Sequence, residues 1–136
     1  MISFGIVSPF FDIAPKPPKS AGVYLFPDTE MRVFYVGMAH SLEAVLYRYK
    51  HLQGRQVMRE RAAAGRFSQV AWLATLNGEA APSLERVCIS HFRPPWNDQH
   101  NPRPRTEATA ITLDDAEREW LLGAERKISA TISELL

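Results

Sequence analysis

Two apolar runs separated by a polar connector form the clearest pattern along the chain. Residues 22–26 (GVYLF) and 33–37 (VFYVG) are rich in β-branched and aromatic side chains, and the connector begins with Pro27 and Asp28. Runs of this composition around a turn-forming segment are typical of two antiparallel strands. The pattern therefore predicts a β-hairpin over residues 22–37.

The register of this hairpin decides which side chains are neighbours. Pairing Phe26 with Val33 places Tyr24 opposite Tyr35, whereas a one-residue slip sends the two tyrosines to opposite faces of the sheet. Gly37, at the open end, leaves room for a backbone or a ligand to approach. For an arbitrary hairpin, the favoured interpretation of the two tyrosines is that they are ordinary amphipathic sheet residues.

Apolar residues at helical spacing predict three helices after the hairpin. Residues 42–51 carry such a stripe behind Ser41, which can cap the helix, and residues 55–64 predict a second helix that ends at a glycine. Ser83 can cap a third helix at residues 84–92, which the following pair of prolines stops.

The remaining segments predict a strand, a linker and a tail helix. Residues 68–76 favour a third strand, and residues 2–13 could hold one more short strand. Residues 98–107 are polar and predict a linker, and Thr112–Asp115 resembles a capping box that begins a long helix over residues 113–135. The apolar face of that helix comprises Ala116, Trp120, Ala124, Ile128 and Ile132.

This order of elements predicts an α+β fold. We expect a small antiparallel three-stranded sheet flanked by helices, plus a C-terminal amphipathic helix. Residues 1–106 would form the domain, and the helix in residues 107–136 would pack on that domain or on a partner.

Composition narrows the class of protein. The 136 residues suit one domain, contain no apolar run long enough for a membrane span, and begin without the basic segment of a signal peptide. We therefore expect a cytoplasmic protein that does not enter the membrane. The single cysteine, Cys88, excludes an internal disulfide and a multi-thiolate zinc site.

Charge is distributed unevenly along the chain. Residues 1–106 carry 13 Lys and Arg against 8 Asp and Glu, whereas residues 107–136 carry 3 against 7. The densest cationic run lies at residues 48–66, where aromatic residues are interleaved at its start. Such a run can follow a phosphate backbone, although a solvated helix surface explains it nearly as well.

Glu85 stands out because its helical neighbours Cys88, Ile89 and Phe92 are apolar. A buried carboxylate is costly unless it is paired, hydrogen-bonded or bound to a metal. An exposed glutamate in the first helical turn is the equally weighted alternative. The four histidines show no spacing typical of a metal site.

Taken together, these features resemble the GIY-YIG nuclease family. Residues 22–24 fit its first motif and residues 35–37 its second, while the lead-in at residues 18–21 resembles the nuclease module of bacterial excision-repair incision proteins. Glu85 and the downstream Asn97 match the family's metal-binding glutamate and the asparagine that follows it. Four motifs in the right order and spacing are strong evidence for the fold.

The resemblance covers about residues 17–98 and implies metal-dependent hydrolysis of phosphodiester bonds in DNA. Glu85 would hold one Mg²⁺ or Mn²⁺, a hard cation suited to oxygen ligands. Tyr24 or Tyr35, with Tyr35 favoured, would orient or deprotonate the attacking water, and Asn97 would brace the site. The residues expected to contact nucleic acid are Gly37, His40, Lys50, Arg55, Arg59 and Arg66.

Two positions depart from the family pattern. Val45 stands where the family has an arginine that stabilises charge on the phosphoryl group, and Met38 stands where the repair branch often has lysine. Arg48 follows Val45 by about one helical turn, and helical side chains lean toward the N-terminus. Arg48 can therefore replace the missing guanidinium, or it is a solvent-exposed arginine and the site is inactive.

Three functions stay open from the sequence. The first is a metal-dependent DNA endonuclease of the GIY-YIG type, similar to the DNA-repair members of the family. Its activity would be weakened if nothing compensates for Val45. The second is an inactive GIY-YIG-like module that binds nucleic acid. The third is a protein-interaction domain whose acidic tail helix docks on a partner or on a second copy.

Overall fold

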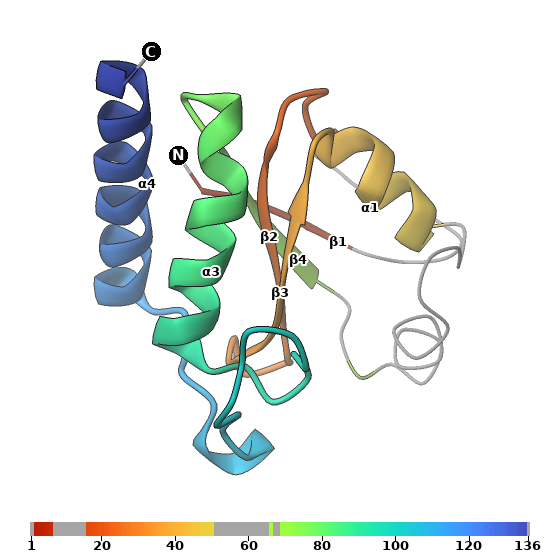
Figure 1. Ribbon diagram of the computed structural model, residues 1–136. Coiled ribbons are helices and arrows are strands. Elements are labelled where there is room, and N and C mark those ends of the chain that lie inside the picture. The colour runs from red at the N-terminus through yellow and green to blue at the C-terminus, as the bar shows by residue number, and fades with distance from the viewer. Residues whose placement is uncertain (1, 7–15, 51–65, 67–68, 136) are drawn as a thin grey trace.

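The computed structural model describes residues 2–6, 16–50, 66 and 69–135 (Figure 1). The strands are β1 (Ser3–Ile6), β2 (Gly22–Pro27), β3 (Val33–Ala39) and β4 (Gln69–Ala74). The helices are α1 (Leu42–Lys50), α3 (Ala81–Phe92) and α4 (Asp115–Leu135), with short 3-10 turns η1 (Gly78–Ala80) and η2 (Glu107–Thr109). The predicted helix at residues 55–64 lies outside the described residues.

The described strands form one antiparallel sheet in the order β1-β4-β2-β3. The predicted three-stranded sheet is therefore wrong by one strand, because β1 pairs with β4 and places Ser3 opposite Trp72. The α+β class with an antiparallel sheet is confirmed. Since β3 lies at one edge of the sheet, its outer backbone groups need partners from outside the sheet.

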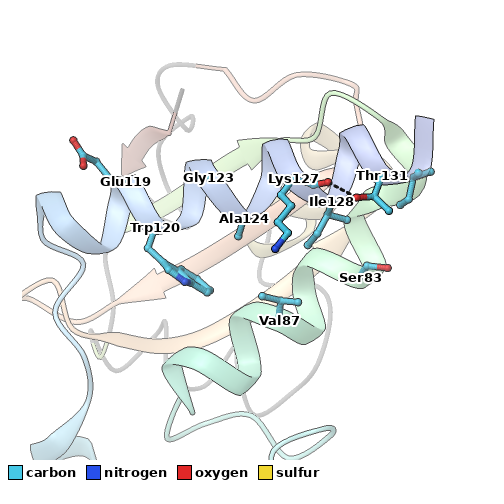
Figure 2. A pocket seen from close by; sticks show the side chains of 10 residues that line it. Ser83, Val87, Glu119, Trp120, Gly123, Ala124, Lys127, Ile128 and Thr131 are labelled. Atoms are coloured by element: carbon cyan, nitrogen blue, oxygen red, sulfur yellow. Dashed lines mark hydrogen bonds between the residues drawn. The ribbon is translucent and has the colours of Figure 1, made fainter. Parts of the chain in front are cut away.

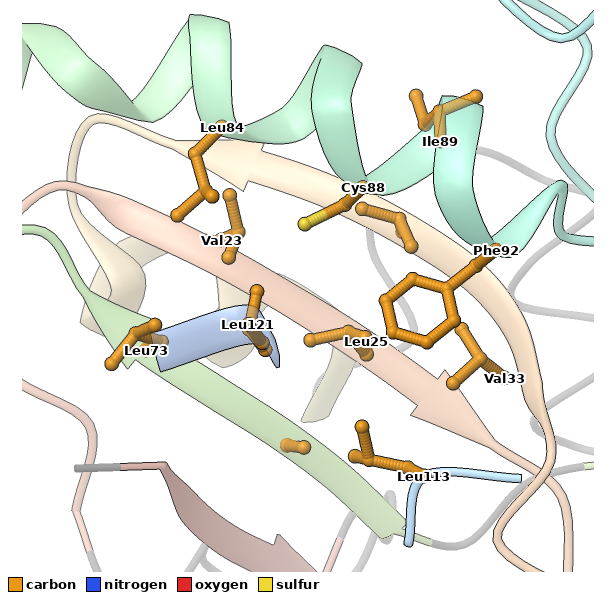
Figure 3. Close-up of a cluster of buried hydrophobic side chains, with 12 residues drawn as sticks. Val23, Leu25, Val33, Leu73, Leu84, Cys88, Ile89, Phe92, Leu113 and Leu121 are labelled. Atoms are coloured by element: carbon orange, nitrogen blue, oxygen red, sulfur yellow. The ribbon is translucent and has the colours of Figure 1, made fainter. Parts of the chain in front are cut away.

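Helices cover both faces of the sheet (Figure 1). Helices α3 and α4 pack on the face of β2, β3 and β4 that presents alternate apolar residues, and α1 lies against the opposite face. The first core contains Val23, Leu25, Val33, Val36, Ala71, Leu73, Leu84, Cys88, Ile89, Phe92, Leu113 and Leu121 (Figure 3). The second contains both motif tyrosines with Phe26, Trp72, Trp96, Leu42 and Leu46. Among the described residues, no helix is long and apolar enough to cross a membrane.

The hairpin forms with a register that differs from the predicted one by two residues. Tyr24 lies opposite Gly37, and Phe26 lies opposite Tyr35, with an irregularity between Phe26 and Pro27. Because side chains alternate with a period of two, this shift keeps both tyrosines on the same face. Their ring centroids lie 6.4 Å apart, so they are diagonal rather than direct neighbours.

The structure confirms one predicted cap and corrects another. The Ser41 hydroxyl accepts a hydrogen bond from the Ala44 amide at 3.3 Å, as expected for the start of α1. Ser83 does not cap α3, because the helix already begins at Ala81. Asn77 instead caps the η1 turn that leads into α3, accepting from the Glu79 amide at 2.9 Å.

The predicted linker at residues 98–107 is wrong, because this segment packs on the domain. The buried Asn101 side chain donates to the carbonyls of Pro94 and Asn97 at 2.8 and 3.0 Å. The Arg105 amide donates to the Arg93 carbonyl at 2.9 Å. Polar composition and prolines conceal these long-range hydrogen bonds at the level of sequence.

Helix α4 begins and packs differently from the prediction. The Asp114 carboxylate, rather than Thr112, caps it by accepting from the Glu117 amide at 2.9 Å. Its buried side chains are Leu121, Glu125 and Ser129. On the predicted apolar face, Trp120, Ala124, Ile128 and Ile132 are only half-buried and Ala116 is exposed.

Candidate active site

Tyr24 lies directly over Gly37 at the centre of the candidate site. A Cβ atom added to Gly37 would lie 2.2 Å from Cζ and 2.3 Å from the hydroxyl oxygen of Tyr24. Real Cβ atoms do not approach other atoms so closely, so the second-motif glycine provides the space that the phenol of the first motif occupies.

We therefore expect Gly37→Ala to destabilise the protein by about 1–3 kcal/mol, the usual cost of overpacking a core. Urea unfolding followed by circular dichroism measures this change. Gly123→Ala in α4 is the matched control, because nothing lies within 4 Å of an added Cβ there. Alanine at that helical position should stabilise the protein by up to about 1 kcal/mol. Equal effects of the two substitutions would refute the steric explanation.

Tyr35 and Tyr24 belong to one aromatic cluster on the face covered by α1. Tyr35 stacks on Phe26 with ring centroids 6.1 Å apart, and the Tyr24 ring meets Phe26 edge-on at 5.5 Å. Tyr24 is 5% exposed and Tyr35 is 8% exposed. Packing on a shared neighbour fixes both rings, so the cluster sets the orientation of the two phenols.

Glu85 approaches the same strand from α3. Its carboxylate is half-buried, and burial raises its pKa above the ordinary value, while the charges of His100 and Arg86 and a hydrogen bond from the Met38 backbone act in the opposite direction. Met38 follows Gly37 on β3, so the carboxylate lies at the end of the second motif. Glu85 is in the second turn of α3, which excludes the predicted alternative of an exposed first-turn glutamate.

The donor set suits a hard divalent cation held by few protein ligands. Among the described residues, no group of three or more His, Cys, Asp and Glu side chains could hold a metal ion. Mg²⁺ usually keeps several waters and binds through one or two carboxylates, and the half-buried Glu85 can supply one. Burial and the charge of Glu85 raise the pKa of Cys88, so this thiol is not a thiolate ligand.

Asn97 fastens the outer edge of β3. Its Oδ1 accepts from the Val36 amide at 2.9 Å, and its Nδ2 donates to the Val36 carbonyl at 2.9 Å. The neighbouring Trp96 amide donates to the Phe34 carbonyl at 3.0 Å. The asparagine loop thus continues the sheet beyond β3 and holds the second motif in place.

His100 is a further candidate site residue, which the sequence reasoning missed. It is close enough to Glu85 for its charge to lower the pKa of that carboxyl, and its backbone adopts a positive φ of 58°. The sequence excluded it only as a metal ligand and placed it in a linker. In the sequence, only its position three residues after Asn97 indicated that His100 could lie near the site.

The other predicted residues that the structure describes lie in several different elements. His40 is exposed just beyond β3, Val45 is half-buried against the tyrosine side of the sheet, and Arg48 is exposed on α1. Among the described residues, Arg48 forms no ion pair with Glu85. Arg66 is exposed near Trp96. The side chain of Lys50 and both Arg55 and Arg59 lie outside the described part of the chain.

Comparisons with known proteins identify the family to which this chain is similar. The UvrC-like GIY-YIG domain model matches residues 20–98. The UvrABC system protein C of Pseudomonas entomophila is 38% identical over 76 residues, which cover 56% of this chain and 12% of that protein. Its counterpart in Methanothermobacter thermautotrophicus is 32% identical over 82 residues, covering 60% of this chain and 14% of that protein. The match thus spans a small part of these relatives.

A solved structure shows the same fold. The GIY-YIG N-terminal endonuclease domain of UvrC from Thermotoga maritima, bound to its catalytic divalent cation magnesium, aligns with a TM-score of 0.52 and 26% identity. The alignment covers 60% of this chain and 88% of that domain.

Proposed function

This chain belongs to the family of UvrC-like GIY-YIG nuclease domains, and we propose that it is a metal-dependent endonuclease that hydrolyses phosphodiester bonds of DNA. The observation that carries the proposal is the convergence on one end of β3. There Tyr24 lies over Gly37, and the carboxylate of Glu85 meets the backbone of Met38. A role in DNA repair is the part of the proposal that follows from the UvrC relatives.

Glu85 would hold the divalent cation, Mg²⁺ or Mn²⁺, which when bound polarises the scissile phosphate. Tyr35 would orient the attacking water and, as a phenolate, would accept its proton. A phenol with an ordinary pKa of about 10 needs a positive charge nearby to act as a base near neutrality. Tyr24 would position the reacting groups, and Asn97 would keep β3 in place beneath them.

Arg48 would supply the guanidinium that Val45 lacks. It is exposed on α1 about one turn beyond Val45. Because helical side chains generally point back toward the N-terminus, its guanidinium would lie over the patch around Val45. The half-buried Val45 packs against the tyrosine side of the core, so it contributes packing rather than charge. An inactive nucleic-acid-binding module is the second candidate, and the same Val45 and Met38 favour it.

Nicking of supercoiled plasmid tests the proposal. We expect nicking with Mg²⁺ or Mn²⁺ and none with EDTA, and we expect Arg48→Ala to lower the rate by about 10²–10³-fold, the usual loss when a group that stabilises transition-state charge is removed. Arg126→Ala removes an exposed arginine from α4 and should leave the rate unchanged. Absence of metal-dependent nicking by the wild type would favour the inactive module.

An interaction role for α4 has one supporting observation. A groove of about 720 Å³ runs between α3 and α4, with Val87, Trp120, Ala124 and Ile128 among its apolar lining residues (Figure 2). Leu121 of α4 and Leu113, which comes just before α4, are almost fully buried in the domain core. This burial supports packing of α4 on this domain, so that a partner would bind along the groove between α3 and α4.

A further inference from the structure

Arg66 takes part in a three-residue contact on the side of the sheet that carries the tyrosines. Its guanidinium forms an ion pair with Glu107 and lies over the ring of Trp96 at 5.6 Å from the centroid. The Trp96 indole nitrogen donates to Oε2 of the same Glu107 at 3.2 Å. Each residue therefore contacts the other two.

This contact is fixed beside the candidate active site. Trp96 packs edge-on against Phe34 with centroids 5.0 Å apart, and its amide bonds the Phe34 carbonyl. The next residue, Asn97, holds Val36 of the second motif. The indole thus supports the Arg66 guanidinium at the edge strand of the site.

The ion pair is accessible to a ligand. About half of each side chain is exposed, 49% for Arg66 and 47% for Glu107. Guanidinium groups bind phosphate oxygens with the same planar fork that binds a carboxylate. A DNA phosphate can therefore take the place of the Glu107 carboxylate.

Glu107 also faces a second cation that is already paired. Arg32 lies within electrostatic range of Glu107, but its guanidinium is bound to Asp28 at 2.9 and 2.7 Å. Asp28 therefore already balances the charge of Arg32, and Arg66 is the cation that loses its carboxylate partner if Glu107 moves away.

We propose that Arg66 is a phosphate-binding residue of the DNA interface and that the Glu107 carboxylate occupies its guanidinium until a DNA phosphate replaces it. Trp96 holds the guanidinium in position during this exchange. This inference rests on the proposed action on DNA. In addition, it makes the Glu107 carboxylate a competitor of the DNA phosphate for the Arg66 guanidinium. Glu107 thereby lowers the affinity of the protein for nucleic acid.

Binding of a fluorescently labelled duplex oligonucleotide in EDTA, measured by anisotropy over a range of KCl concentrations, tests this proposal. We expect Glu107→Gln to tighten binding about two- to fivefold, the range of an exposed ion pair, because glutamine keeps the acceptor for Trp96 and loses only the charge. Arg66→Gln should weaken binding and reduce the slope of log K against log salt by about 0.9.

The double variant separates this mechanism from a general charge effect. If Glu107 acts through Arg66, the double variant binds like Arg66→Gln alone. Glu119→Gln on α4 removes the same charge from an exposed position and should not tighten binding. A gain that persists in the Arg66→Gln background, an equal gain from Glu119→Gln, or no salt-dependent DNA binding by the wild type would overturn the proposal.

The nicking assay distinguishes this proposal from the nuclease assignment. Coupling between Glu107 and Arg66 in a protein that binds DNA but does not nick it would support the inference and reject the nuclease function. Metal-dependent nicking without any effect of Glu107→Gln on binding would do the reverse.

Discussion

Replacing Glu85 with glutamine is expected to lower metal-dependent nicking by about 10²–10³-fold or more. Polarisation by a bound cation is worth several kcal/mol, and each 1.36 kcal/mol corresponds to a factor of ten in rate. Glutamine keeps the size of the side chain and an acceptor for the Met38 backbone, but it is a poor ligand for Mg²⁺. Nicking rates and Mg²⁺ titration calorimetry on both proteins measure the loss.

The same substitution should stabilise the fold at neutral pH. Burial raises the pKa of Glu85, so the folded state holds its proton more tightly than the unfolded state does. Stability of the wild type therefore falls as pH rises from the unfolded pKa through the raised folded pKa. The glutamine side chain does not titrate in this range. The variant should therefore be more stable than the wild type above the raised pKa, and this difference in stability should disappear as pH falls below the ordinary pKa of glutamate.

Urea unfolding of both proteins between about pH 3.5 and 8 checks this expectation. An activity loss together with higher stability at neutral pH identifies a residue kept for function at a cost in stability. Equal nicking by the two proteins would remove Glu85 from the site. A glutamine variant that is less stable at neutral pH would contradict the assigned cost of burying the charge.

Local patterns were sufficient to predict the hairpin but not its register. The apolar runs around Pro27 specify two strands, and the period of two keeps Tyr24 and Tyr35 on one face. The observed pairing differs by two residues from the predicted one and is irregular between Phe26 and Pro27. The composition of the connector did not predict this difference. The structure also shows why both motifs need glycine, which the sequence could not. An added Cβ on Gly22 would lie 2.2 Å from the Leu73 carbonyl oxygen.

Contacts between distant segments could not be predicted from the sequence. Strand β1 needs β4 as a partner, and β4 follows it by more than 60 residues. Residues 98–107 look like a linker because Asn101 and Arg105 are polar, yet both bond backbone carbonyls left open near the end of α3. The charge of His100 influences Glu85 only because this segment folds back onto the domain. The family resemblance identified Glu85 and Asn97, and the structure shows what each touches.

Replacing Asn97 with alanine is expected to destabilise the protein by about 2–5 kcal/mol. The substitution removes the partners of the Val36 amide and carbonyl, and an unpaired buried polar group costs about 1–3 kcal/mol. Because β3 is an edge strand of the sheet in the described part of the chain, no neighbouring strand there can replace them. Urea unfolding gives the free energy, and hydrogen exchange at the Val36 amide reports the local opening.

Asn97→Asp and Asn101→Ala provide the matched comparisons. Aspartate still accepts from the Val36 amide but cannot donate to its carbonyl when ionised, so its cost should fall between those of the wild type and the alanine variant. Asn101→Ala removes donors to the Pro94 and Asn97 carbonyls without touching β3, so it should leave protection of the Val36 amide high. If Asn97→Ala keeps that protection, the asparagine does not hold the strand, and its role must lie in direct contact with the reacting groups. If protection is lost while Glu85→Gln leaves it intact, strand positioning and metal binding are separate requirements of one site.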